Sequence, residues 1–268
     1  MTPEIRVVGA PAAPPNRPRL SVEGMTKSFN GRPAIEDVSF TVDEHEFVAV
    51  LGQSGAGKTT LFRCVAGLLA PDQGIARIGG DRITSLRGRD RRRLAVVFQQ
   101  FNLVSRLSAF ENVLAGLLGH VPAWRGWLRS FARADRLLAL ECLDRVRLLA
   151  HAAQRADRLS GGQQQRVAIA RALAQQAELI IADEPVASLD PNTSAEILDL
   201  LRNIARSDGI GVVCSLHQVP YAKAYADRIV GLSHGRVMLD VPTERFDRAA
   251  FEQLYGSPAI SAAPASAA

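Results

Sequence analysis

Short apolar runs alternate with helical stretches along most of this chain. Four runs of strand length contain few polar positions, at 47–51, 94–98, 179–182 and 210–216. Runs that lack a polar face are typical of parallel strands whose sheet is covered on both sides. The pattern therefore predicts an α/β fold with a mostly parallel core sheet.

The sequence also marks where helices should begin. One is predicted to start near Lys58, shortly after the first strand. Another should follow Asp190, because an aspartate before Pro191 is a favourable N-cap and first helical position, and Asp208-Gly209 ends that helix. Between about residues 100 and 160, leucine, alanine and arginine dominate and apolar residues recur at helical spacing, which predicts an inserted helical subdomain.

Composition favours one large domain between two tails. The chain has 268 residues, 47% of them hydrophobic, which is enough to bury a sizeable core. Residues 1–19 and 257–268 are of low complexity and cannot bury enough apolar area to offset the entropy of ordering. We expect both tails to be disordered and residues 20–256 to form the folded domain.

Membrane, disulfide and zinc signals are missing from the sequence. No apolar stretch approaches the roughly 20 residues that a membrane-spanning helix needs, and the N-terminal segment lacks the apolar run of a signal peptide. Cys64, Cys142 and Cys214 lie far apart and form no C-x-x-C pair. We therefore expect a cytosolic protein whose cysteines are buried apolar residues.

The net charge of +5 permits an anionic partner but does not require one. The densest basic cluster, at 87–93, has no interleaved aromatic residue. This composition favours a solvated surface over a contact with lipid or nucleic acid.

Two segments have the features of phosphate-binding helix starts. The segment Gly52-Gln53-Ser54-Gly55-Ala56-Gly57-Lys58-Thr59 fits the pattern G-x-x-x-x-G-K-[ST], whose glycines let backbone N–H groups face phosphate oxygens. The segment Ser160-Gly161-Gly162 also precedes an amphipathic stretch, but it has no lysine of its own. Farther along, Glu184 follows Asp183 at the end of an apolar strand, where a carboxylate can act as a base toward water.

Six motifs occur in a fixed order and carry a family resemblance. They are Gly52–Thr59, Gln99, Leu159-Ser-Gly-Gly-Gln163, Leu179–Glu184, Ser188-Leu-Asp190 and His217. From about Leu20 to Gly256 the chain resembles the ATP-binding cassette (ABC) family, because P-loop enzymes in general lack the Leu-Ser-Gly-Gly-Gln run. The resemblance implies a P-loop NTPase nucleotide-binding domain with a mostly parallel core sheet, an antiparallel β subdomain and the inserted helical subdomain.

The resemblance assigns ATP and Mg²⁺ as ligands and gives each motif a role. ATP would be held by residues 52–60, including Thr60, with Phe29 stacking on adenine. Thr59 and Gln99 would ligate Mg²⁺, and Asp183 would help to hold it through water. Glu184 would be the catalytic base, while His217 and Lys58 would contact the γ-phosphate.

A second copy of the chain would complete each site. In the family, the segment Ser160-Gly161-Gly162-Gln163 of one copy caps the nucleotide held by Lys58 of the other, and Asp190 lies at the seam. The remaining partners would be separate transmembrane permease subunits and, indirectly, a periplasmic solute-binding protein, at the cytoplasmic face of the cell inner membrane. The helical subdomain and the Gln99 region would form the groove for a permease helix, and no nucleic-acid partner is expected.

Two questions stay open at this stage. The stretch from Pro122 to Phe131, which contains Trp124 and Trp127, either packs within the helical subdomain or contacts the permease or the bilayer surface. The transported solute is also open: the run Ser215-Leu-His-Gln-Val219 most resembles the ATPases of phosphonate importers, and the alternative is an importer for phosphate, phosphite or another small polar solute. A soluble ABC ATPase acting on nucleic acid or ribosomes is disfavoured, because the chain has one motif set and no sustained heptads.

Overall fold

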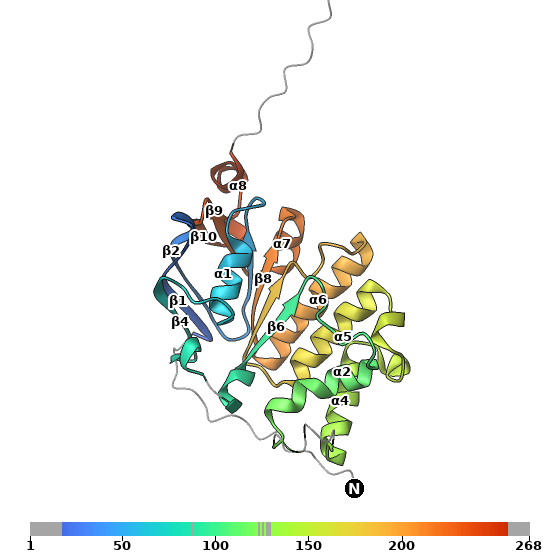
Figure 1. Cartoon of the computed structure of the whole chain (residues 1–268). Coiled ribbons are helices and arrows are strands. Elements are labelled where there is room, and N and C mark those ends of the chain that lie inside the picture. Colours follow the sequence, from blue (N-terminus) through green and yellow to red (C-terminus); the bar gives the residue numbers. More distant parts are fainter. Residues whose placement is uncertain (1–17, 87, 123, 125, 127–129, 257–268) are drawn as a thin grey trace, which may run out of the picture.

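The computed structural model describes residues 18–86, 88–122, 124, 126 and 130–256, and the statements below refer to these residues (Figure 1). Most of both expected tails and Trp127 lie outside the described residues. Arg19, which the sequence analysis assigned to the N-terminal tail, forms ion pairs with Glu44 at 2.7 Å and Glu178 at 3.5 Å.

The elements follow one another in a strand-rich first part and an α/β second part. In chain order they are β1 (Leu20–Phe29), β2 (Arg32–Val42), β3 (Phe47–Leu51), α1 (Lys58–Val65), β4 (Gln73–Ile78), β5 (Asp81–Arg82), the 3₁₀ helices η1 (Ile83–Ser85) and η2 (Gly88–Arg93), β6 (Leu94–Phe98), α2 (Ala109–Gly116), η3 (Leu117–Gly119), α4 (Arg133–Arg145), η4 (Leu149–His151), η5 (Ala156–Arg158), α5 (Gly161–Ala174), β7 (Leu179–Asp183), α6 (Pro191–Asp208), β8 (Gly211–Leu216), α7 (Val219–Tyr225), β9 (Arg228–Ser233), β10 (Arg236–Pro242), η6 (Thr243–Arg245) and α8 (Arg248–Tyr255).

The core sheet contains all four strands that the sequence predicts. Its strand order is β10-β9-β3-β8-β7-β6, and every neighbouring pair except β10 with β9 is parallel. A second sheet, in the order β2-β1-β4-β5, is antiparallel throughout. The predicted fold class, a mostly parallel core sheet with an antiparallel β subdomain and an inserted helical part, is therefore confirmed.

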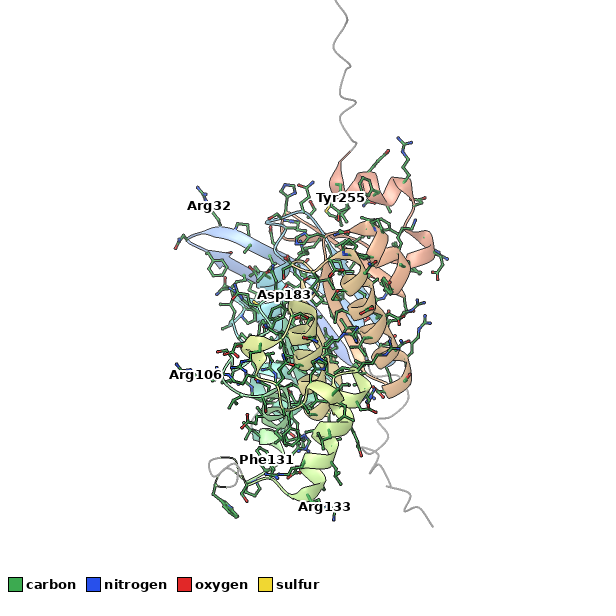
Figure 2. The ribbon with its side chains drawn as sticks, turned by 90° about the vertical axis from the view of Figure 1, so that its right-hand side faces the viewer. Arg32, Arg106, Phe131, Arg133, Asp183 and Tyr255 are labelled. Atoms are coloured by element: carbon green, nitrogen blue, oxygen red, sulfur yellow. The ribbon has the colours of Figure 1, made fainter. Side chains whose placement is uncertain are left out.

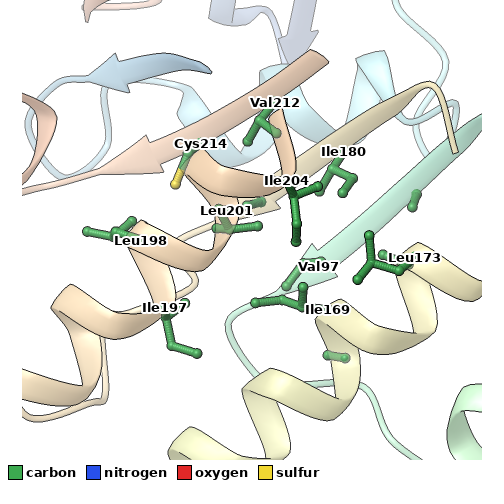
Figure 3. Close-up of a cluster of buried hydrophobic side chains, with 14 of the residues drawn as sticks. Val97, Ile169, Leu173, Ile180, Ile197, Leu198, Leu201, Ile204, Val212 and Cys214 are labelled. Carbon is green, nitrogen blue, oxygen red and sulfur yellow. The ribbon is translucent and has the colours of Figure 1, made fainter. Parts of the chain in front are cut away.

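The two faces of the core sheet pack against different layers. Alternate residues of each strand point to opposite faces. One face packs on α5 and α6, where Val97, Ile180 and Val212 meet Ile169 and Leu201 (Figure 3). The opposite face belongs to a second buried cluster.

That second cluster joins the core sheet to α1 and the antiparallel sheet. Val48, Ile181 and Val213 of the core strands share it with Leu61 of α1 and Val38 of β2. Because both faces are covered by apolar layers, the central strands need no polar side, which explains their uninterrupted apolar sequences.

The segment between β6 and α5 is helical. It contains α2, η3, α4, η4 and η5, and α2 and α4 pack on α5. A capping box between Ser108 and Glu111 fixes the start of α2. Among the described residues, no helix combines the length and the apolar character needed to cross a membrane.

Two arginines of the basic cluster at 87–93, Arg92 and Arg93, are partly buried rather than fully solvated. Arg93 donates to Glu178 at 2.8 Å and to Asp81 at 2.8 Å, and Arg92 hydrogen bonds to His120 at 3.0 Å. These arginines therefore tie the edge of β6 to neighbouring segments. The three cysteines are free and buried, as expected.

Candidate functional site

Residues from four strand ends meet at one edge of the core sheet. The carboxyl ends of parallel strands lie at the same edge, which is where α/β folds bind ligands. The loop Gly52–Gly57 follows β3, Gln99 follows β6, Glu184 follows β7, and His217 follows β8. In Figure 2, Asp183 at the end of β7 lies between the end of the molecule that carries Tyr255 and the end that carries Phe131 and Arg133.

The loop between β3 and α1 is shaped by its glycines. Gly57 is the N-cap of α1 with φ = 104°, a conformation that residues with side chains rarely adopt. A Cβ at Gly57 would lie 2.5 Å from the carbonyl oxygen of Ala34. Near Gly55 a Cβ would meet nothing within 4 Å, so the loop is open on that side. The first N–H groups of α1 have no acceptor within the helix, and the loop therefore forms a cradle of backbone donors.

The side chain of Lys58 contacts the backbone of this loop. Lys58 is 4% exposed, and its ammonium group donates to the carbonyl oxygens of Gly52 at 2.8 Å and Gln53 at 3.1 Å. Burial lowers the pKa of Lys58, and the charges of Glu184 and Asp183 oppose that shift. Ser54, Thr59 and Thr60 complete the segment, with Ser54 exposed and both threonines partly exposed.

Asp183 and Glu184 are joined through Ser215 of β8. The Ser215 hydroxyl donates to Asp183 Oδ1 at 2.9 Å and accepts from the Glu184 N–H at 2.8 Å. Burial raises the pKa of Asp183, while the hydroxyls of Ser215 and Thr59 stabilise its charged form. The carboxylate thus lies beside the first turn of α1.

Glu184 has an unusual backbone and a close partner. Its φ is 50°, in the left-handed region that residues other than glycine rarely adopt. Its side chain is 20% exposed, and Oε1 lies 2.5 Å from Nε2 of His217. Left-handed residues other than glycine are concentrated at functional sites, and this pair is exposed enough to reach a bound ligand.

Gln99 lies at the same edge and is exposed. The chain behind it turns through Phe101 and Asn102, both with positive φ, at 54° and 49°. Arg171 of α5 donates to the carbonyl oxygens of Asn102 at 2.7 Å and Phe101 at 3.4 Å. Burial lowers the pKa of Arg171. The position of the segment after Gln99 is therefore tied to α5.

The second helix start has the capping geometry of an exposed N-terminus. Ser160 is the N-cap of α5, its hydroxyl accepts from the Gln163 N–H at 3.3 Å, and the Gln163 side chain accepts from the Ser160 N–H at 2.9 Å. Gly161 lies near Leu189 and Phe101, and a Cβ on Gly162 would lie 2.4 Å from Thr193 Cγ2. Gly162 is thus required for packing on α6, a reason that the sequence did not reveal.

Within one chain, the residues nearest to Gly161 and Gly162 at this second helix start are Phe101, Leu189 and Thr193, which lie after Gln99, before α6 and within α6. Asp190 lies beside it as the exposed N-cap of α6 and accepts from the Thr193 N–H at 3.0 Å. Hydrogen bonds from the side chain and then the backbone of Thr193 lower the pKa of Asp190. The Ser160 segment and Asp190 therefore lie close together at the starts of α5 and α6.

Phe29 lies at the end of β1 and is 48% exposed. The ammonium group of Lys27 lies 5.8 Å from the centre of its ring, and Lys27 is held by Asp72 at 2.7 Å. An exposed aromatic ring is available for stacking, whereas a core phenylalanine is not.

Sequence reasoning missed three residues that shape the site. Ser215 could have been noticed as the polar residue at the end of an apolar strand, and Arg171 as a charge among small apolar residues of α5. No sequence signal marks Tyr255, whose carbonyl oxygen accepts from the Gln53 side chain at 3.2 Å. Burial raises the pKa of Tyr255. The last helix, α8, therefore touches the cradle.

Comparisons with known proteins agree on one family. The family described as ABC transporter matches residues 35–187. The chain is 48% identical over 238 residues to the Phosphonates import ATP-binding protein PhnC of Rhodopseudomonas palustris, covering 87% of this chain and 88% of that relative. It is 53% identical over 228 residues to the protein of the same name from Frankia casuarinae, covering 81% and 88%.

A third relative is named for a different solute, and solved structures share the fold. The Hypophosphite import ATP-binding protein HtxD of Stutzerimonas stutzeri is 46% identical, covering 90% of this chain and 72% of that relative. Among solved structures, the dimeric post-hydrolysis state of the ATP-binding cassette MJ0796 bound to ADP and Pi matches with a TM-score of 0.73 and 34% identity, covering 84% of this chain and 98% of that one.

The partly buried carboxylate of Asp183 predicts a pH-dependent stability difference. Because its folded-state pKa is raised above the usual value of about 3.9, the folded chain takes up a proton on Asp183 before the unfolded chain does as the pH falls. The free energy of unfolding of the wild type should therefore rise relative to that of Asp183→Asn as the pH falls toward about 3.9. Urea unfolding of both proteins without ligand measures this difference.

Asp72 supplies the matched control. The hydrogen bond from Lys27 lowers the pKa of Asp72, so the advantage of the wild type over Asp72→Asn should shrink as the pH falls toward that lowered value. If the stability of the wild type relative to each variant changed in the same direction with falling pH, the raised pKa assigned to Asp183 would be contradicted.

Proposed function

The chain belongs to the ABC transporter family, and we propose that it is the ATPase subunit that drives uptake of phosphonates through a separate membrane permease. This proposal rests mainly on the 48% identity, over 87% of the chain, to a phosphonate import ATP-binding protein. ATP binding and hydrolysis follow from the family. The solute is inferred from the relatives alone, because an ATPase of this kind does not touch the cargo.

Hypophosphite is the competing solute. The relative named for hypophosphite import is 46% identical to this chain, close to the values of the phosphonate relatives. The alternatives that the sequence leaves open are phosphate, phosphite or another small polar solute. Phosphate and phosphite are small phosphorus oxyanions, as hypophosphite is. Phosphonate is preferred because several relatives that cover more than four fifths of the chain carry that name.

The cradle at residues 52–60 would bind the triphosphate of ATP. Its open side at Gly55 and its free helix-start N–H groups fit an anion, and Lys58 adds a positive charge next to them. Binding would require Lys58 to exchange its contacts with Gly52 and Gln53 for phosphate oxygens. The exposed ring of Phe29 would stack on the adenine, a contact worth about 1 kcal/mol.

The donor set beside the cradle suits Mg²⁺, a hard cation that prefers oxygen ligands. Within the described part of the chain, no three His, Cys, Asp or Glu side chains gather closely enough to hold a metal ion by themselves. Thr59 and Gln99 would therefore share the ion with phosphate oxygens, and Asp183 would hold it through water. When bound, Mg²⁺ neutralises charge on the phosphates.

Glu184 and His217 fit the hydrolytic step. The carboxylate of Glu184 would accept a proton from the attacking water, and the 2.5 Å contact to His217 fixes the direction of that carboxylate. Because His217 is 41% exposed, its ring can also face the γ-phosphate. Lys58 would stabilise the charge that develops on the transferred phosphoryl group.

Two copies would be needed to surround each ATP. The group formed by Ser160, Gly161, Gly162 and Gln163 offers helix-start N–H groups without a lysine, and the residues nearest to its glycines within the chain are Phe101, Leu189 and Thr193. In a head-to-tail dimer this group would cap the γ-phosphate held by the partner, and Asp190 would lie between the two sites. The dimeric state of the related MJ0796 cassette supports this arrangement.

The proposed role in transport implies further partners besides the second copy of the chain. We place the chain at the cytoplasmic face of the cell inner membrane, bound to transmembrane permease subunits and acting indirectly with a periplasmic solute-binding protein. The exposed side chains of Val104 and Trp124, 54% and 62% exposed, lie in and after the segment that follows Gln99. They are available for the permease helix. No nucleic acid partner is part of the proposal.

Replacing Glu184 by glutamine separates binding from turnover. The cradle is unchanged in Glu184→Gln, but an amide cannot accept the proton from water, so ATP hydrolysis should fall by about 10²–10⁴-fold while ATP still binds. A dimer should then accumulate with ATP and be visible by size-exclusion chromatography. Steady-state turnover close to that of the wild type would overturn the assignment of the base.

Growth on defined phosphorus sources tests the solute. A host strain that lacks this chain should grow on phosphate but not on a phosphonate as sole phosphorus source, and the wild-type gene, but not the Glu184→Gln variant, should restore growth. The same strains on hypophosphite and phosphite provide the comparison. Restoration on hypophosphite or phosphite alone would replace phosphonate as the solute and leave the ATPase assignment intact.

A further inference from the structure

We propose that Ser215 is a positioning residue for ATP hydrolysis, which fixes Glu184 relative to Asp183 through the two hydrogen bonds of its hydroxyl group. The inference rests on the proposed function, because it concerns the residue assigned there as the base. Ser215 itself lies within the sheet and acts only through its neighbours.

Ser215 is a polar residue in an apolar layer. It is 0% exposed. Two positions earlier on the same face of β8 is Val213, and the neighbouring strand contributes Ile181 to that layer. Burying a hydroxyl among such residues costs free energy unless both its donor and its acceptor capacity are used. A serine at this position therefore needs a reason, and packing alone does not supply one.

The strand register supplies the contacts. Ala182 pairs with Cys214 in the parallel register of β7 and β8, so Asp183 lies beside Ser215 on the same face of the sheet. The hydroxyl donates to Asp183 Oδ1 at 2.9 Å and accepts from the Glu184 N–H at 2.8 Å. One side chain thus ties the carboxylate of one residue to the backbone of the next.

The bond to the Glu184 N–H matters because of the backbone conformation there. With φ = 50°, Glu184 is in a conformation that residues with a Cβ avoid unless their surroundings hold them in it. Its N–H would be partly buried and without an acceptor if the hydroxyl were absent. The same backbone directs the carboxylate to His217, 2.5 Å away. Loss of the hydroxyl should therefore release Glu184 from the position in which it meets His217.

The other hydrogen bond of the Ser215 hydroxyl goes to Asp183. Its carboxylate is next to Thr59 in the first turn of α1, where the phosphates are proposed to bind. The hydroxyl therefore connects the side of the site that holds the nucleotide to the side that activates water. A change in Ser215 should alter the rate of hydrolysis more than the affinity for ATP.

Ser215→Ala tests the proposal, with Thr243→Val as the matched control. Thr243 is also buried, and its hydroxyl donates to the Ala226 carbonyl oxygen at 2.8 Å, outside the site. Both variants lose one buried hydroxyl. We expect Ser215→Ala to lower kcat for ATP at least tenfold with KM changed by less than about twofold, and Thr243→Val to keep the wild-type kcat. Thermal unfolding and binding of a fluorescent ATP analogue show that each variant is folded.

A second comparison asks whether Ser215 acts through Glu184. In a Glu184→Gln background the base is already lost, so adding Ser215→Ala should lower the residual rate by less than about twofold and leave ATP binding unchanged. The proposal is overturned if Ser215→Ala keeps the wild-type kcat, if it loses ATP binding or folding, or if it lowers the residual rate of Glu184→Gln tenfold as well. A wild-type chain without ATPase activity would instead contradict the proposed function.

Discussion

The candidate site is built around the hydrogen bond that the Ser215 hydroxyl donates to the partly buried carboxylate of Asp183. Through this contact β8 is joined to β7 at the edge where both strands end. The same hydroxyl holds the backbone of Glu184, whose side chain meets His217. Because Asp183 also lies beside the start of α1, these contacts bring the two carboxylates and the histidine close to the helix start that carries Lys58.

The fold and the positions of the motifs could be read from the sequence because both depend on short-range patterns. The strands at 47–51 and 94–98 were predicted with the bounds that the structure shows, and Asp190 is the N-cap of α6 as expected. Apolar runs that alternate with capped helices are compatible with few folds other than an α/β fold with a parallel core sheet. The antiparallel sheet and the roles of the motif residues required the family resemblance.

Other features could not be read from the sequence because they depend on contacts between distant segments. Gly162 is needed for its approach to Thr193, and Arg171 holds the segment after Gln99 across about 70 positions of sequence. The arginines at 92 and 93 looked like a solvated surface because their partners, His120 and Glu178, are remote in the chain. Such contacts leave no local pattern in one sequence.

The central claim is that a single chain carries two halves of different sites: a cradle with Lys58, and an exposed helix start at Ser160 that has no lysine. A structure of the chain with Mg²⁺ and a nonhydrolysable ATP analogue tests this most directly. The account predicts a dimer in which each γ-phosphate contacts Lys58 of one copy and the Ser160–Gly162 segment of the other. A single copy whose own Ser160 segment encloses the nucleotide beside its own Lys58 would contradict it.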